Sequence, residues 1–369
     1  MLKRYITALT DDTELARHRR ALGRTWDERV ALVCPGIEDN LGDLAIHDAT
    51  VALTEGLGVR LERVPYITRE RRLARLGLSG SRYFRGVLIG GGTLINDYWL
   101  DQAEAWGELV AHAWTFGTGV GSSGFSQHSQ VALDPRWASL LSRFAGVGVR
   151  GPLSMSRLHD AGVEQAEVVG DAALGLVRSH GALAPVGAHD WFLVNVAGAP
   201  QAGHREVADS IDIAAAAARE FAASGLRPLP IAFTPWDAEP TNEVMRRIGS
   251  RECVRTPLTL PQLMALLAEC VTGVSVRLHG GILAATAGAP TLLFAYRDKA
   301  WDYLASMDAG RLGLDASVSP DAAAERARDL LADLEPMRAH TLERAEHWAQ
   351  VQEDYARRTF AGALEPAAR

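Results

Sequence analysis

The sequence predicts an α/β protein made of two doubly wound domains, and three observations support this fold class. First, short apolar and β-branched runs such as 29–34 and 85–92 alternate with helix-like stretches, which is typical of a parallel sheet covered on both faces. Second, 369 residues exceed the size at which one hydrophobic core usually stops growing. Third, a loop rich in Gly, Ala and Pro at 178–190 interrupts the alternation, which restarts with an apolar strand at 191–198.

The loop at 178–190 divides the chain into an N-terminal α/β domain, residues 1–182, and a C-terminal α/β domain, residues 183–369. In the first domain, apolar runs indicate strands and mixed polar stretches indicate helices, in the order strand 29–34, helix 42–58, strand 59–66, strand 85–92, helix 100–114, strand 145–151, helix 152–162 and strand 166–171. In the second domain the same criteria give strand 191–198, helix 210–225, strand 229–234, helix 261–270, strand 271–276, helix 280–288 and strand 290–296. A cleft between the domains is the expected ligand site.

Capping residues support the helices near the C-terminus, which we expect over 319–360. Ser319 can cap the first of them, Pro320 suits the first helical position, and Asp321 favours the positive end of the helix dipole. A second helix follows Pro336.

Composition narrows the functional classes. The net charge of −7 argues against a general nucleic-acid binder, because such proteins usually carry a basic surplus. The three cysteines, Cys34, Cys253 and Cys270, stand apart in the sequence, so neither a zinc site nor a disulfide framework is indicated. No signal-peptide core and no stretch of about 18 apolar residues is present, so we expect a cytoplasmic protein that does not span a membrane.

One segment is strongly basic. Eight arginines lie between Arg60 and Arg85, against only Glu62 and Glu70. They indicate either a solvated helix face or a patch for a polyanion or an anionic lipid head group, and with a lipid-linked acceptor the patch could hold the protein at the cytoplasmic face of a membrane.

Polar residues and glycines follow the first strands of the N-terminal domain, where open α/β sheets bind ligands. Asn40 and Asp43 stand where a helix should begin, so they predict either a plain N-cap or a loop whose N–H groups face a ligand. Three glycines at 90–92 permit a close backbone approach to a sugar or an anion. No Gly-Lys-Ser/Thr follows them, so a nucleotide P-loop is not indicated.

Arginines follow two later strands. Arg150 ends the strand at 145–151 and predicts either a structural ion pair or a fork for phosphate or carboxylate. Asp171, after a further strand, is either a turn residue or an arginine partner. Arg277 and His279 stand two residues apart after the strand at 271–276, so at an extended strand end they would point to the same side. Because burying an unpaired guanidinium is costly, we expect a bound anion, rather than a protein group, to be the partner of Arg277.

Together these motifs resemble the polysaccharide pyruvyl transferases. The matching stretches are DNLGDLAIHDA, LIGGGTLIND, FGTGVG, VGVRGPLSMSRLHDAG, VVGDAALG and SVRLHGGILAATAGAPTLLFAYRDK, in this order over about residues 30–300. The resemblance implies two Rossmann-like domains in a GT-B-like arrangement. It also implies transfer of the pyruvyl group of phosphoenolpyruvate to two hydroxyls of a sugar, with release of phosphate and without a metal or redox cofactor.

The resemblance assigns roles to the residues of these motifs. Catalysis would fall to His279 as proton donor, with Asp43 as a candidate for the base or for orienting the acceptor hydroxyls. Donor binding would fall to Arg150, Ser154, Arg277, Gly280 and Lys299. Acceptor binding would fall to Asn40, Gly91, Gly92, Asn96 and Asp97. The partners are thus a small-molecule donor and a glycan acceptor, with no prediction of oligomeric state.

Two alternative functions compete with this one. A GT-B glycosyltransferase would share the architecture but should show an acidic residue for the ribose and a base-binding loop, and the sequence offers no convincing candidate. A non-catalytic sugar- or polyanion-binding protein is disfavoured because Arg150, Arg277 and His279 are all retained. The family motif has proline after the aspartate where this chain reads Gly170-Asp171-Ala172, a departure that bears on the acceptor more than on the donor.

Overall fold

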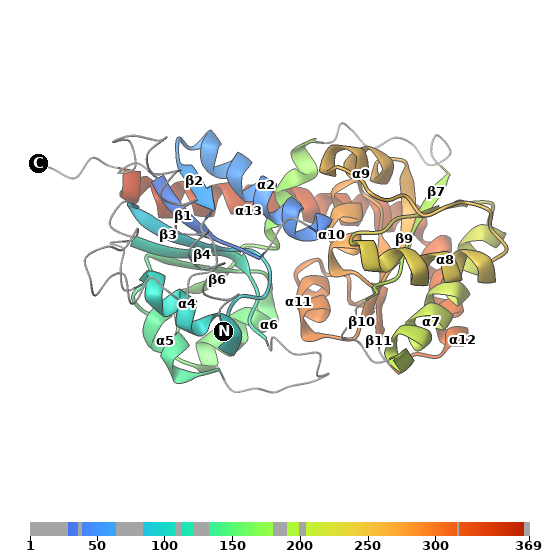
Figure 1. Ribbon diagram of the computed structural model, residues 1–369, viewed down its shortest axis with the longest axis horizontal. Helices are drawn as coiled ribbons and strands as arrows, with labels where there is room; N and C mark the ends of the chain where they lie inside the picture. The colour runs from blue at the N-terminus through green and yellow to red at the C-terminus, as the bar shows by residue number, and fades with distance from the viewer. Residues whose placement is uncertain are drawn as a thin grey trace, which may run out of the picture.

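The computed structural model describes residues 29–35, 39–63, 84–107, 112–121, 133–179, 190–198, 204–315 and 317–364. Within them the chain forms two parallel β-sheets with helices packed on their faces (Figure 1). The predicted α/β fold class is therefore confirmed. The N-terminal 28 residues, most of the arginine-rich segment and most of the loop at 178–190 lie outside the described residues.

The first sheet has six parallel strands in the order β2-β1-β3-β4-β5-β6. Their bounds are β1 Arg29–Val33, β2 Arg60–Arg63, β3 Gly86–Gly90, β4 His112–Thr118, β5 Gly146–Val149 and β6 Ala166–Val168. The sequence prediction missed β4, because it assigned the start of this strand to a helix at 100–114. The segment HAWTFGT contains strand-favouring Trp, Thr and Phe residues, and its pairing with β3 and β5 shows that it is a strand.

Side chains alternate between the two faces of this sheet, as the pleat requires. Val30 and Leu32 join the core beneath the helix α2 (Leu41–Gly56), whereas Ala31 and Val33 join a separate core on the opposite face. The helices of that opposite face are α4 (Asp97–Gly107), α5 (Pro135–Leu141) and α6 (Pro152–Asp160). A 3₁₀ helix, η3 (Ala172–Ser179), follows β6 and packs against α2.

The second sheet has five parallel strands in the order β11-β10-β9-β7-β8. Their bounds are β7 Trp191–Asn195, β8 Arg227–Pro230, β9 Cys270–Ser275, β10 Thr291–Ala295 and β11 Gly313–Asp315. The helical segments are α7 His204–Ala223, η4 Pro235–Asp237, α8 Ala238–Arg247, α9 Leu260–Leu267, α10 Leu278–Thr286, α11 Asp298–Ser306, η5 Gly310–Leu312 and α12 Pro320–Ala332. Ser319 caps α12 by accepting a hydrogen bond from Ala322 N, as predicted.

The last helix, α13 (Leu334–Leu364), connects the two halves of the molecule (Figure 1). Trp348 donates to the carbonyl of Ser306 on α11 at 2.9 Å, and Tyr355 donates to the carbonyl of Thr115 on β4 at 2.9 Å. The helix therefore begins on the second sheet and ends on the first, although the sequence division places all of 319–360 in the C-terminal domain.

The strand order of the two sheets indicates where a ligand would bind. In each sheet the first strand of the unit, β1 or β7, lies between the second strand and the third, so the chain changes direction of winding beside it. Ligands of open α/β sheets bind outside the carboxyl ends of the strands at such a switch point. Two such points exist here, one in each sheet.

Candidate active site

A cavity of about 520 Å³ lies between the carboxyl ends of the two sheets. On the side of the first sheet its wall includes the residues that follow successive strands, namely Pro35, Gly92, Val120 and Arg150. On the side of the second sheet it includes Phe233, Arg277 and Arg297, which follow β8, β9 and β10. The cavity is therefore built from both switch points at once.

The first turns of four helices also line this cavity. They contribute Asp43 from α2, Tyr98 from α4, His279 from α10 and Lys299 from α11. Helix N-termini carry partial positive charge, which favours an anion near them, although Asn40 and Asn96 already accept from N–H groups at the starts of α2 and α4. With Arg277, Arg297 and Lys299 in the same wall, the cavity is suited to a small polyanion.

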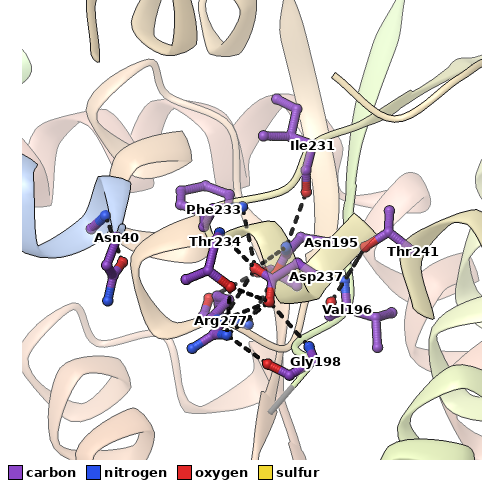
Figure 2. A network of polar contacts seen from close by, with 12 residues as sticks. Asn40, Asn195, Val196, Gly198, Ile231, Phe233, Thr234, Asp237, Thr241 and Arg277 are labelled. Carbon is purple, nitrogen blue, oxygen red and sulfur yellow. Dashed lines mark hydrogen bonds and ion pairs between the residues drawn. The ribbon is translucent and has the colours of Figure 1, made fainter. Parts of the chain in front are cut away.

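Arg277 has a protein partner, so the prediction that only a bound anion would pair with it is wrong. Its Nε and Nη2 donate to Asp237, which is fully buried, at distances of 2.7–3.1 Å (Figure 2). Nη2 also donates to the carbonyl of Gly198 at 2.8 Å and to Thr234 at 3.1 Å. Asp237 lies in η4, 40 residues earlier in the chain, so no local pattern around Arg277 could reveal it.

The rest of Arg277 remains open to the cavity. Nη1 makes no hydrogen bond with a described residue, and the side chain is 26% exposed. Asp237 also accepts hydrogen bonds from the backbone N–H groups of Gly198, Phe233 and Thr234 (Figure 2). This network fixes the guanidinium so that one of its nitrogens remains available to a ligand.

Arg277 and His279 do not lie on an extended strand end, contrary to the prediction. Strand β9 ends at Ser275, Arg277 is the N-cap residue of α10, and His279 lies in its first turn. The imidazole packs against Gly42 of α2, where any Cβ atom would overlap it. Gly42 is thus needed for the close approach of the two domains.

His279 is neutral in the free protein near pH 7. Burial, followed by the nearby cations Lys299 and Arg150, lowers its pKa to about 4, although Asp171 acts in the opposite direction. Its Nε2 is shielded from solvent and has no hydrogen-bond partner among the described residues. A buried, unsatisfied ring nitrogen at a cavity wall is a candidate contact for a ligand.

Asp43 is held at the start of α2 by Asn40. Asn40 caps the helix by accepting a hydrogen bond from Gly42 N at 3.0 Å, which is one of the two alternatives predicted from the sequence. The Nδ2 of Asn40 also donates to the carboxylate of Asp43 at 2.7 Å. Burial raises the pKa of Asp43 to about 6, despite the opposing charges of Lys299 and Arg277. Asp43 can therefore carry a proton in the pH range where enzymes exchange protons with substrates.

Lys299 is the third cavity residue with a displaced pKa. Burial, followed by the cations Arg297 and Arg150, lowers its pKa to about 7, although Asp43 acts in the opposite direction. The ammonium group is therefore held in a site that already has a surplus of positive charge. An entering anion would relieve this repulsion and favour the charged form.

Arg150 forms a buried ion pair with Asp171, which is one of the two alternatives predicted from the sequence. Its Nε donates to Asp171 at 2.8 Å, Nη1 to Thr93 at 3.4 Å, and Nη2 to the carbonyl of Gly92. The side chain is only 1% exposed. The two Nη groups thus hold the loop with Gly92 and Thr93 in place at the cavity wall, and direct contact of Arg150 with a donor stays a prediction.

Four other predicted site residues are not among those that line the cavity. Asp97 is exposed, and the missing side chains of Gly91 and Gly280 let Ile46 and Ser275 pack closely. Ser154 is buried, where its hydroxyl donates to Asp302 at 2.6 Å and accepts from Val120 N at 2.9 Å. The predicted residues at the cavity are therefore Asn40, Asp43, Gly92, Asn96, Arg150, Arg277, His279 and Lys299.

Asp302, which the sequence did not single out, links the two halves of the cleft. Its carboxylate on α11 accepts from Leu153 N at 2.9 Å and from Ser154 N at 3.1 Å, so it caps α6 of the other half. Nearby, Arg157 on α6 pairs with Asp298 on α11. These contacts hold the first turn of α11, which carries Lys299, beside the first sheet.

Replacing Ser154 with Ala should weaken the fold rather than donor binding. The buried Asp302 would lose a donor and Val120 N would lose its acceptor, so we expect the free energy of unfolding to fall by about 1–3 kcal/mol. Urea denaturation and calorimetric titration with phosphoenolpyruvate measure the two effects. Unchanged stability with a tenfold loss of donor affinity would instead make Ser154 a donor ligand.

In the described part of the chain, no helix combines the length and the apolar character that crossing a bilayer requires. No three His, Cys, Asp or Glu side chains there are grouped to hold a metal ion.

Solved structures with a similar fold are sugar-nucleotide enzymes. UDP-GlcNAc 2-epimerase from Neisseria meningitidis, solved with UDP-GlcNAc, aligns with a TM-score of 0.55 at 10% identity over 90% of this chain and 99% of that one. MnaA from S. aureus, solved with UDP, aligns with a TM-score of 0.59 at 11% identity over 92% and 97%. UDP-GlcNAc 2-epimerase from Methanocaldococcus jannaschii gives 0.51 at 9% identity over 83% and 92%. The predicted GT-B-like fold is thus confirmed.

The family is shown by sequence rather than by these structures. A search of curated proteins found no match. The family model of the polysaccharide pyruvyl transferases matches residues 40–298, which include most of the cavity wall. The chain therefore belongs to the polysaccharide pyruvyl transferase family, and its cavity is the candidate site for pyruvyl transfer.

Proposed function

We propose that this transferase takes its pyruvyl group from phosphoenolpyruvate and attaches it to two hydroxyls of a sugar as a cyclic ketal, releasing phosphate. One observation carries the proposal: the cavity brings four helix N-termini together with Lys299 and the open nitrogen of Arg277. A donor with a phosphate and a carboxylate needs such a concentration of positive charge. Asp43 and His279 lie in the same wall and can exchange protons with it.

The reaction needs one proton delivered and two removed. A proton adds to the methylene carbon of phosphoenolpyruvate, which makes C2 electrophilic. One sugar hydroxyl then bonds to C2 and loses its proton, and the C2–O bond to phosphate breaks. The second hydroxyl bonds to C2 and loses its proton, which closes the ketal. Of the two protons released, one replaces the proton delivered and one leaves on hydrogen phosphate.

The pKa values divide these tasks between two residues. Asp43, with a pKa raised to about 6, carries a proton in a larger fraction of the free protein than His279 does, so we assign proton delivery to Asp43. His279, with a pKa lowered to about 4, is neutral and suited to accept the hydroxyl proton. This assignment differs from the sequence-based expectation, in which His279 delivers the proton. Lys299 and Arg277 would offset the charge on the departing phosphate.

The function is tested by incubating the purified protein with phosphoenolpyruvate and a panel of glycans, including lipid-linked ones. The expected result is phosphate release that depends on the acceptor, together with a mass gain corresponding to a pyruvate ketal. Turnover of a nucleotide sugar without phosphate release from phosphoenolpyruvate would support the glycosyltransferase alternative instead. Binding of glycans without turnover of either donor would support a non-catalytic role.

Donor binding should depend on pH through Lys299. Its ammonium form attracts the donor phosphate, so affinity should fall as the pH rises through about 7, where Lys299 loses its proton. Lys299→Arg keeps a charge at every accessible pH, so it should retain affinity in the alkaline range. Calorimetric titration with phosphoenolpyruvate between pH 6 and 9 measures both proteins. Parallel losses of affinity in the two proteins would show that Lys299 does not cause the effect.

A further inference from the structure

The two walls of the cavity differ in chemistry. The wall from the second sheet carries Arg297, Lys299 and Arg277, and Arg277 keeps one nitrogen open to the cavity although Asp237 pairs with it. The wall from the first sheet carries only Arg150 as a cation, and Asp171 already neutralises it. That first wall contributes two aromatic side chains instead, Tyr98 and Trp99 on the first turn of α4.

These aromatic residues form a defined surface, which we call the α4 platform. Tyr98 and Trp99 pack edge to face, with ring centroids 5.6 Å apart and an interplanar angle of 83°. Tyr98 is 58% exposed, whereas Leu100 and Ala103 of the same helix are buried and anchor it to the sheet. Trp99 packs partly against that core, so the platform stands on a fixed base.

The neighbouring polar residue, Asn96, is mainly engaged at the start of α4. The Asn96 side chain accepts from Tyr98 N at 2.9 Å and Trp99 N at 3.2 Å, and its amide donates to the carbonyl of Thr93. Its hydrogen-bonding groups therefore hold the start of α4. Asp97 is exposed and does not line the cavity. Of the predicted acceptor residues of this helix, only the remaining N–H of Asn96 could therefore contact a ligand beside the rings.

We infer that the α4 platform binds the acceptor glycan by stacking a pyranose ring on Tyr98. This inference rests on the proposed function, because it names the acceptor side of the same cavity. A pyranose has a face of C–H groups with partial positive charge, which is attracted to the electron-rich face of an aromatic ring. The cavity is also larger than a three-carbon phosphate ester requires, so donor and sugar ring fit together.

The test measures binding and turnover in the same samples. The probes are methyl glycosides of glucose, galactose, mannose and their N-acetylamino forms, titrated by saturation-transfer NMR with the full chain. For the glycosides that wild type binds, Tyr98→Ala should lower the affinity by about tenfold, with the affinity for phosphoenolpyruvate unchanged. Tyr98→Phe keeps the ring face and should bind like wild type. Trp236→Ala is the matched control, because Trp236 is 61% exposed and is not among the residues that line the cavity.

Several outcomes would overturn the inference. The first is that Tyr98→Ala binds the glycosides as tightly as wild type does. The second is that Tyr98→Ala and Trp236→Ala lose the same glycoside affinity. The third is that wild type binds none of the probes. Phosphate release separates this inference from the proposed function. If wild type releases phosphate from phosphoenolpyruvate and Tyr98→Ala leaves the affinity for the acceptor unchanged, the platform alone is rejected. Glycoside binding that depends on Tyr98, without release from any acceptor, would reject the proposed function alone.

Discussion

Replacing Asp43 with Asn should lower kcat by about 10²–10⁴-fold, the usual contribution of a positioned general acid. The amide cannot deliver a proton to the methylene carbon, yet it fills the same space and can still bond to Asn40. Donor affinity should hold or rise, because a negative charge leaves a site built for an anion. Acceptor-dependent phosphate release and calorimetric titration with phosphoenolpyruvate measure the two quantities.

The matched control is Asp48→Asn on the same helix. Asp48 pairs with His47 and does not line the cavity, so its loss should leave kcat close to the wild-type value. An Asp43→Asn protein with wild-type kcat would remove Asp43 from the chemistry. Equal losses of kcat and of donor affinity would instead point to a binding role.

Replacing Asp237 with Ala should reduce the free energy of unfolding by about 3–5 kcal/mol, because several buried donors would lose their acceptor at about 1–3 kcal/mol each. Arg277 and three backbone N–H groups would all lose an acceptor. The guanidinium would also lose its fixed orientation, so donor affinity should fall even in conditions where the protein remains folded. Urea denaturation and donor titration measure these changes.

Asp212→Ala is the control, because it breaks an ion pair with Arg247 that lies at the surface. Exposed pairs contribute little, so its unfolding midpoint should stay near that of wild type. Arg277→Lys completes the set: it keeps the charge but loses the planar fork, so we expect it to lose donor affinity. An Asp237→Ala protein that unfolds at the wild-type urea concentration would contradict the positioning role of Asp237.

The architecture was largely predictable because its main signals are local. Apolar strands such as β3 and β9 are continuous in the sequence, and the cap at Ser319 consists of adjacent residues. Strand β4 was missed because its start was assigned to a helix, and its pairing with its neighbours in the sheet shows that it is a strand. The crossing of α13 to the first sheet depends on contacts such as Tyr355 with Thr115, which are 240 residues apart.

The site was predictable in its location but not in its connections. Asp43, His279 and Lys299 could be expected at the cavity because each follows a strand end, where this class of sheet binds ligands. Other interactions at the site depend on tertiary structure. Asp237 pairs with Arg277 from a distant turn, and Asp302 accepts the hydrogen bond of the Ser154 hydroxyl. The aromatic pair of α4 was overlooked because an aromatic residue in a helix usually indicates core packing, and only its exposure at the cavity shows otherwise.

The most direct test of the central claim follows the carbon that changes its bonding. Phosphoenolpyruvate labelled with ¹³C at C2 is incubated with the protein and an acceptor glycan, and the product is examined by ¹³C NMR while phosphate is measured. We expect the label in a ketal carbon bonded to two oxygens of one sugar, with one phosphate released for each ketal formed. Label that remains in the donor, or that appears only in free pyruvate, would contradict pyruvyl transfer at this cavity.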